Sequence, residues 1–191
     1  MTISTARSSV LHLLFEALKP SDSIIDIDTA KVLVCSLVLT RLDFINSILC
    51  GLPLCQLERL QRIQNWAAKV VLGSAYVDPE SALKSLHWLP INERINFKIL
   101  CLVHKCLHNS EPKYLKDLLH FKTFTRSTRA STSPMILSVP RTVKATFASR
   151  AFSVQGPILW NKLPVSLREA TDFKTFKRHL KTHIFKAIFR N

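Results

Sequence analysis

The segment Ile91 to Asn109 places the strongest constraint on the fold. Its apolar residues recur every three or four positions, at Ile91, Ile95, Ile99, Leu102, Val103 and Cys106. This spacing gathers them on one face of an α-helix, and Arg94, Lys98 and Lys105 fall off that face. The whole chain has only three glycines, which favours long helices over a fold with many tight turns. We therefore expect a mostly α-helical fold.

Two further long helices are predicted upstream of this segment. The first runs from Thr29 to Cys50 and ends at Gly51-Leu52-Pro53, with Leu33, Leu37, Phe44 and Ile48 directed inward. The second runs from about Leu54 to Leu72 and ends at Gly73, with Leu57, Leu60, Ala67 and Val71 directed inward. Short helices are expected after Pro79 and from Pro112.

The C-terminal part of the chain has a different character. Residues 123–133 are rich in Ser, Thr and Arg and predict a linker, and Met135 to Val139 is a candidate for one short strand. Thr171 to Phe189 predicts a terminal amphipathic helix, with Phe173, Phe176, Leu180 and Ile184 inward and Lys174, Lys177, Arg178 and Lys181 outward. These patterns divide the whole chain into four predicted segments: an N-terminal segment and connector (1–28), a helical domain (29–120), a basic linker (121–149) and a C-terminal segment with a basic helix (150–191).

Positive charge is concentrated at one end of the chain. The net charge is +14, and residues 1–120 carry 13 Lys/Arg and 11 Asp/Glu, whereas residues 121–191 carry 14 and 2. Such asymmetry predicts a balanced folded part followed by a part that faces a polyanion. Nucleic acid is the favoured polyanion, with an acidic membrane surface as the alternative. The apolar run 32–39 is far shorter than the roughly 20 residues that span a bilayer, so no membrane insertion is expected.

The cysteines indicate a reducing compartment. They are odd in number and lie inside apolar segments, at Cys35, Cys50, Cys55, Cys101 and Cys106. No signal-peptide pattern precedes them. We expect an intracellular protein of the nucleus or cytoplasm, not a secreted one, with buried thiols rather than disulfides.

Three cations in the predicted helix 54–72 are candidates for phosphate contacts. Arg59, Arg62 and Lys69 fall on one side, and their spacings of three and seven keep them in register along the helix. Gln61 and Asn65 lie beside them. An ordinary solvated face is the alternative interpretation.

Further candidate cations lie closer to the C-terminus. They are Arg126, Arg129, Arg141, Lys144 and Arg150 around the linker, and Lys177 and Lys181 in the terminal helix. Cations among hydroxyls and small residues suit phosphate contacts, which give affinity with little sequence discrimination. Because no aromatic residue alternates with the linker cations, a base-stacking platform is poorly supported. A basic tether without contacts is the alternative.

Other residue groups are assigned structural roles. Cys101, His104 and His108 share a helix side, but no fourth ligand is near them, so we interpret them as a packed cysteine with two boundary histidines and expect no metal. Trp66, Trp88 and Trp160 are interpreted as core or hinge anchors, with Trp160 docking the terminal helix. No nucleophile elbow or glycine-rich phosphate loop is present, so neither a catalytic residue nor a cofactor is expected.

Five short strings carry a resemblance to a known family. They are LDFINSILCGLP (Leu42 to Pro53), LQRIQNWAAKV (Leu60 to Val70), LHWLP (Leu86 to Pro90), SVPR (Ser138 to Arg141) and LWNKLP (Leu159 to Pro164). Together, in this order, they resemble the C-terminal part of the reverse transcriptase polyprotein of LINE-type, non-LTR retrotransposons of the Jockey-like branch. The resemblance covers nearly the whole chain from residue 30 onward.

The resemblance implies a non-catalytic region. The family's RNA-directed DNA polymerase chemistry needs carboxylates that hold two divalent cations, in a palm segment with an aromatic-x-Asp-Asp string. This chain has no Asp-Asp pair, and Tyr76-Val77-Asp78 continues into Pro79. The family's palm lies upstream of the matching part. The helices that follow it form a thumb on the template–primer backbone, so the resemblance implies a thumb-like bundle and gives the helix 54–72 that role.

Two functions from different classes follow from the sequence. The first is a non-catalytic C-terminal fragment of a reverse transcriptase that contacts RNA or DNA backbone without sequence preference. The second is a helical protein–protein interaction module derived from such a fragment. In that case an exposed apolar helix face, for example on Ile91 to Asn109, would bind a partner helix or a second copy of the chain.

Overall fold

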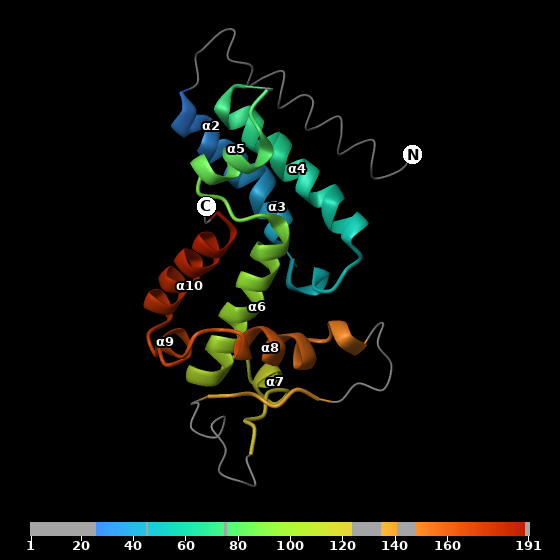
Figure 1. The fold of residues 1–191 in the computed structure, drawn as a ribbon, viewed down its shortest axis with the longest axis vertical. Coiled ribbons are helices and arrows are strands. Elements are labelled where there is room, and N and C mark those ends of the chain that lie inside the picture. Colours follow the sequence, from blue (N-terminus) through green and yellow to red (C-terminus); the bar gives the residue numbers. More distant parts are fainter. Residues whose placement is uncertain (1–25, 45, 75, 124–134, 141–147, 190–191) are drawn as a thin grey trace. The chain divides into compact units, whose positions relative to one another are not determined.

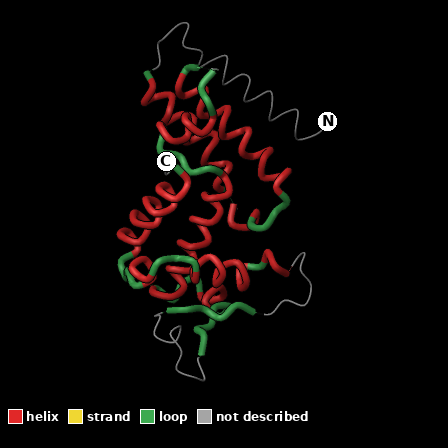
Figure 2. Tube along the Cα trace, viewed as in Figure 1, coloured by secondary structure: helices red, strands yellow, loops and turns green. Residues whose placement is uncertain are grey.

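A computed structural model describes residues 26–44, 46–74, 76–123, 135–140 and 148–189 (Figures 1 and 2). The fold of these residues is mostly helical, as predicted, and Figure 2 shows no strand among them. The chain divides into two compact units: a first unit of residues 1–44 and 55–91, and a second unit of residues 45–54 and 92–191. The units group residues by packing and so differ from the four predicted segments, whose boundaries stay predictions.

The first unit begins with three consecutive helical stretches, α2 (Ile27–Val34), the π-helix η2 (Cys35–Leu39) and α3 (Thr40–Asp43). Asp26 caps α2, because its carboxylate accepts a hydrogen bond from the backbone N–H of Thr29 at 3.1 Å. The buried residues of this stretch are Ala30, Val34, Val38 and Leu39.

The predicted inward face of this stretch was wrong. Leu37, Phe44 and Ile48 are exposed. The buried residues Ala30, Val34 and Val38 follow one another at intervals of four and continue from α2 into η2, so the inward face lies one residue beyond Leu33 and Leu37. The helix also stops earlier than predicted, because the backbone of Phe44 is extended and a separate 3-10 turn, η3 (Asn46–Leu49), follows in the second unit.

The rest of the first unit is formed by α4 (Leu54–Leu72) and α5 (Pro79–Ser85). Gly73 ends α4 with φ +63°, as the sequence predicted; its N–H donates to Val70 at 3.2 Å, and that of Ser74 donates to Lys69 at 3.3 Å. This is a Schellman motif, whose left-handed position favours glycine. The predicted helix after Pro79 is confirmed, and Asp78 caps it by accepting from the N–H of Ser81 at 3.0 Å.

The second unit contains most of α6 (Ile91–His108), followed by α7 (Lys113–Lys116), η5 (Ala148–Arg150), α8 (Phe152–Asn161), α9 (Val165–Arg168) and α10 (Phe173–Ile188). The predicted face of α6 is confirmed for Ile91, Ile95, Ile99, Val103 and Cys106, which are buried. Leu102 is only half-buried. Leu100, Cys101 and His104 are also buried, so the centre of the buried face lies to one side of Leu102.

An extended segment of the second unit takes the place of the predicted strand. Phe121 and Leu137 form one isolated antiparallel bridge, flanked by hydrogen bonds from Lys122 N–H to the Ile136 carbonyl (2.9 Å) and from Ser138 N–H to the His120 carbonyl (2.8 Å).

Side chains of α8 hold this extended segment from a second direction. The Asn161 side chain accepts from Leu137 N–H at 2.9 Å and donates to the Leu137 carbonyl at 2.8 Å, and Trp160 Nε1 donates to the Met135 carbonyl at 2.9 Å. Trp160 and Asn161 of the string LWNKLP thus hold Met135 and Leu137, and Leu137 directly precedes the string SVPR.

Candidate nucleic-acid interface

The helix α10 presents a strongly basic surface. The helix begins at Asp172, whose carboxylate accepts from Thr175 N–H at 2.8 Å. Phe176, Leu180 and Ile184 are buried, as predicted. The cations Lys174, Lys177, Arg178, Lys181 and Lys186 are all exposed, and no Asp or Glu occurs within the 16 residues of the helix. The packing thus directs every lysine and arginine of α10 toward solvent.

Aromatic contacts fix α10 within the second unit. The Phe176 ring stacks on the His104 imidazole with centroids 4.1 Å apart and lies 5.9 Å from the Trp160 ring. Lys105 of α6 places its ammonium 4.8 Å from the centroid of Phe173, a cation–π contact. The predicted docking of the terminal helix by Trp160 is confirmed, although Trp160 lies in the last turn of α8 and not in a loop.

His104 is part of the core that supports α10. Its side chain is fully buried, and Nε2 lies 2.7 Å from the Ala170 carbonyl, just ahead of α10. The prediction of a boundary histidine was therefore wrong for His104. Burial lowers the pKa of His104, and the neighbouring His108 lowers it further. The hydrogen bond to Ala170 and the charge of Asp172 act in the opposite direction. A neutral His104 donates from Nε2 to the carbonyl, which leaves Nδ1 without a proton.

A second group of cations lies on α4 in the first unit. Arg59 and Arg62 are exposed, whereas Lys69 is half-buried in the last turn. The pKa of Asp78 is lowered first by its hydrogen bonds to Ser81 and, to a smaller extent, by the charge of Lys69. Lys69 therefore lies near a carboxylate, and Arg59 and Arg62 are the more accessible of the three predicted contacts.

Trp66 lies among these cations, and its interpretation as a core or hinge anchor was wrong. Its side chain is 53 % exposed, whereas Trp88 and Trp160 are buried as predicted. Trp66 follows Arg62 by four residues and precedes Lys69 by three. Residues at these spacings are neighbours on a helix surface. The spacing alone could have placed Trp66 on the solvent face.

The amides beside the cations have an internal role. Gln61 Nε2 donates to Gln64 at 3.0 Å and to Asn65 at 2.8 Å, and Gln61 Oε1 accepts from Ile91 N–H at 2.8 Å. Gln64 is fully buried and donates to the Leu89 carbonyl at 2.8 Å. Gln61 and Gln64 thus hold the LHWLP turn and the start of α6 against α4, and their hydrogen bonds lie within the fold.

The remaining cations predicted to contact phosphate differ in their exposure, and some lie outside the described residues. Lys177 and Lys181 are exposed on α10. Arg150 is half-buried, with its side chain over Gly51 and its Nε buried without a hydrogen-bond partner among the described residues. Arg126, Arg129, Arg141 and Lys144 lie outside the described residues. Lys174 and Arg178 join Lys177 and Lys181 on α10 and extend the predicted set.

The group Cys101, His104 and His108 has the character of a packed core. Burial raises the pKa of the Cys101 thiol to about 11, although Lys177, Lys98 and Lys105 act in the opposite direction. Burial also lowers the pKa of His108. No cluster of three or more metal-ligating side chains occurs in the part of the chain that the structure describes.

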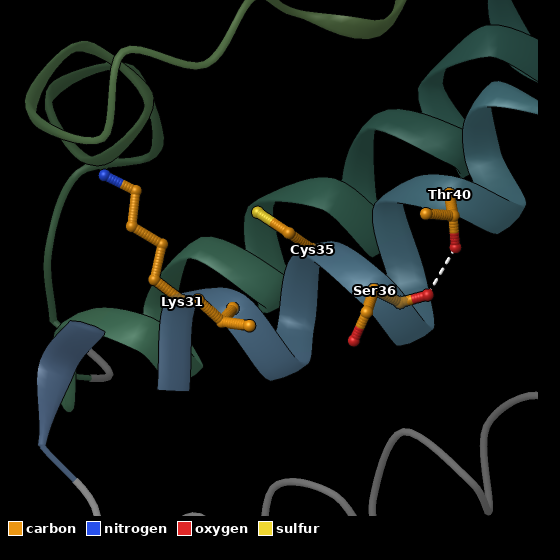
Figure 3. Close-up of a pocket in the computed structure, with 5 residues that line it drawn as sticks. Lys31, Cys35, Ser36 and Thr40 are labelled. Atoms are coloured by element: carbon orange, nitrogen blue, oxygen red, sulfur yellow. Dashed lines mark hydrogen bonds between the residues drawn. The ribbon is translucent and has the colours of Figure 1, made fainter. Parts of the chain in front are cut away.

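The first unit also has a shallow hollow of about 460 Å³ along α2, η2 and α3 (Figure 3). It is lined by Lys31, Val32, Cys35, Ser36 and Thr40. The Thr40 hydroxyl donates a hydrogen bond to the backbone carbonyl of Ser36 in the preceding turn. The proton of this hydroxyl is therefore used within the helix. The surface that these residues present to the hollow is mainly apolar.

Comparison with family models, with curated proteins and with solved structures finds no match to this chain. No helix among the described residues combines the length and the apolar character needed to cross a bilayer.

Proposed function

We propose that the chain is a non-catalytic C-terminal fragment of a non-LTR retrotransposon reverse transcriptase that contacts the backbone of RNA or DNA without sequence preference. The observation that carries this proposal is α10, a helix whose lysines and arginines are all exposed and which contains no carboxylate. The family origin rests on the five strings and their order. The absence of an Asp-Asp pair from the sequence is the reason for proposing binding without polymerase chemistry.

The geometry of α10 suits a polyphosphate. Lys174, Lys177, Arg178 and Lys181 lie within eight consecutive residues, and the first and last are about 10 Å apart along the helix. Phosphates of one B-DNA strand recur about every 3.4 Å along the axis, so several fall within this length. Because the helix is fixed by its buried face, the cations are presented together, and contacts of this kind act through charge and not through base identity.

Salt dependence tests the proposal. Fluorescence anisotropy of the full chain with a labelled RNA–DNA hybrid, from about 50 to 300 mM salt, is expected to show binding that weakens steeply as salt rises. Absence of binding at the lowest salt would contradict the proposal.

A matched pair of variants locates the surface. Lys177→Gln/Lys181→Gln should make the plot of log affinity against log salt shallower by up to about 2 units, because each phosphate contact contributes roughly 0.9. Lys84→Gln/Lys113→Gln removes the same net charge from exposed positions on α5 and α7 and should change the slope much less. Equal changes in both variants would argue against a surface on α10.

A second function is favoured by a separate observation. Val32 is 66 % exposed and Leu37 is 47 % exposed, and Val32 lines the hollow of Figure 3. Exposed apolar side chains of this kind suit the interaction module, whereas the face of α6 that the sequence suggested for that role is buried. Concentration-dependent sedimentation that is lost in Val32→Ser/Leu37→Ser, together with no binding to the hybrid, would favour this second function.

A further inference from the structure

The solvent face of α4 combines one aromatic side chain with cations on both sides of it. Arg62 lies one turn before Trp66, Lys69 lies one turn after it, and Arg59 lies one turn before Arg62. Arg59 and Lys69 are about 15 Å apart along the helix. The opposite face is buried through Gln64, Ala67, Ala68 and Val71, which is why Trp66 is directed outward.

The charge of this face is positive despite two nearby carboxylates, Glu58 and Asp78, the second of which interacts with Lys69. Glu58 is exposed and lies one turn before Arg62, so it offsets part of the charge at that end. Arg59 and Lys69 remain on either side of the indole. A ligand that follows the helix would therefore meet a cation, an aromatic ring and a second cation in sequence.

An indole between two cations suits a nucleic acid whose bases are unpaired. In a duplex the base faces are covered by stacking within the helix, so only the phosphates would reach this surface. In a single strand a base can lie on an aromatic ring while the flanking phosphates meet the cations. A site for backbone alone would need only the cations and would make no use of the exposed indole.

We propose that α4 binds a single-stranded nucleic acid, with one unpaired base stacked on Trp66 and the adjoining phosphates held by Arg59, Arg62 and Lys69. The inference rests on the proposed function, because it requires that the chain contact nucleic acid. It adds the class of ligand, an unpaired strand. It also assigns different contacts to the two helices, because α10 would contact the phosphate backbone and α4 would stack one base.

Two substitutions at Trp66 test the stacking. Binding of the full chain to a labelled oligothymidylate and to a duplex of equal length is compared by anisotropy. Trp66→Ala should weaken binding to the single strand by about 5- to 150-fold, since stacking of one base contributes about that much. Trp66→Phe keeps an aromatic face and should retain most of the affinity, and the duplex affinity should be nearly unchanged in both variants. Equal single-strand affinity of the wild type and Trp66→Ala would overturn the proposal.

Tryptophan emission gives a direct readout of the contact. Trp88 and Trp160 are buried and Trp66 is 53 % exposed, so stacking should quench the emission of Trp66 selectively. Addition of oligothymidylate should reduce the emission of the wild type and leave that of Trp66→Phe unchanged. A rise in anisotropy without quenching would overturn the stacking and leave the proposed backbone binding intact.

The same measurements separate the inference from its foundation. If neither the hybrid nor the oligothymidylate binds at low salt, the proposed function itself fails. If Trp66→Ala abolishes self-association in sedimentation without changing binding to nucleic acid, Trp66 belongs to a protein contact, and the proposal for α4 is overturned.

Discussion

In each of the two units, a side-chain amide forms hydrogen bonds to the backbone of an irregular segment, but the arrangement of these bonds differs between the units. In the first unit, Gln61 and Gln64 of α4 bond to the backbone around Leu89 and Ile91 and also to one another. In the second unit, Asn161 alone makes both hydrogen bonds to Leu137, and Trp160 adds one to Met135. The first unit thus relies on a network, and the second relies on one amide beside an aromatic core.

This difference teaches what the family-like strings contribute. Gln64, Trp88 and Trp160 come from three of these strings, and all are buried. In contrast, the exposed cations of α10 lie outside every string. These buried members of the strings hold segments together, whereas the charged surface of α10 has to be argued from exposure.

The largest expected effect separates buried from exposed tryptophans. Trp160→Ala should lower the free energy of unfolding by about 3–5 kcal/mol, because it opens a cavity beside Phe176 and removes the hydrogen bond to Met135. Trp66→Ala should cost far less, since its side chain is half-exposed. Urea titration followed by circular dichroism measures both. Similar costs would show that the placement of Trp66 is wrong.

Isosteric replacements test the two amide devices. Gln64→Glu should cost about 3 kcal/mol at pH 7 and Asn161→Asp about 2 kcal/mol, because each places a carboxylate oxygen against a carbonyl and Gln64 is the more deeply buried. Protonation at about pH 4.5 restores a donor, so much of the loss relative to wild type should be recovered. Gln56→Glu, at an exposed position of α4, is the matched control and should change little.

Acid should destabilise the second unit through His104. Burial lowers the pKa of His104 in the folded protein below its unfolded value near 6.5, so the unfolded state binds more protons. Stability is complete above that value and is lost as the pH falls below it, by up to about 1.4 kcal/mol per pH unit for one proton. His108 and Asp172 are the titratable neighbours that act on it.

Unfolding measured between about pH 7.5 and 5.5 tests this expectation. His104→Phe should be less stable at neutral pH, because it loses the bond to Ala170, but it should depend less on pH. His179→Gln, at an exposed position of α10, should keep the wild-type dependence. The hydrogen bonds to Thr29, Ser81 and Thr175 lower the pKa of the capping carboxylates Asp26, Asp78 and Asp172, respectively, so their contributions are lost in a more acidic range, below about pH 4.

The smallest effect compares two glycines with positive φ. Gly73→Ala in the first unit should cost about 1 kcal/mol, the strain of a left-handed alanine. Gly51→Ala should cost more, because φ is +69° and the added Cβ would also lie 2.8 Å from Arg150 Cγ. Thermal unfolding of the two variants measures the difference. A Gly51→Ala variant as stable as Gly73→Ala would mean that Arg150 moves aside without cost.

Sequence patterns predicted the parts of the fold whose signals are local. The clean spacing from Ile91 to Cys106 identified the buried face of α6, and the alternation of Phe176, Leu180 and Ile184 with lysines identified α10. Pro79 and Gly73 marked a helix start and a helix end. Each of these depends on neighbours within a turn or two, which periodicity and capping describe directly.

The errors arose where a distant contact decides the structure, or where two sides of a helix have the same apolar spacing. Val34 and Val38 have the same spacing as Leu33 and Leu37, so the pattern alone does not decide which pair is buried. The segment around Leu137 is held by Asn161, 24 residues away, and this partner has no strand pattern of its own. Trp66 was interpreted from its residue type, although its spacing to Arg62 and Lys69 was visible in the sequence.

The contact between Gly51 and Arg150 joins two residues that the ribosome synthesises far apart in time. Residues 45–54 belong to the second unit but are made before the segment 55–91 that completes the first. At roughly 5–20 residues per second, Arg150 emerges about 5–20 s after Gly51. All residues of the first unit are therefore synthesised while residues 45–54, which lie between its two parts in the sequence, still lack their partners in the second unit. The second unit can become complete only after α10 has been synthesised.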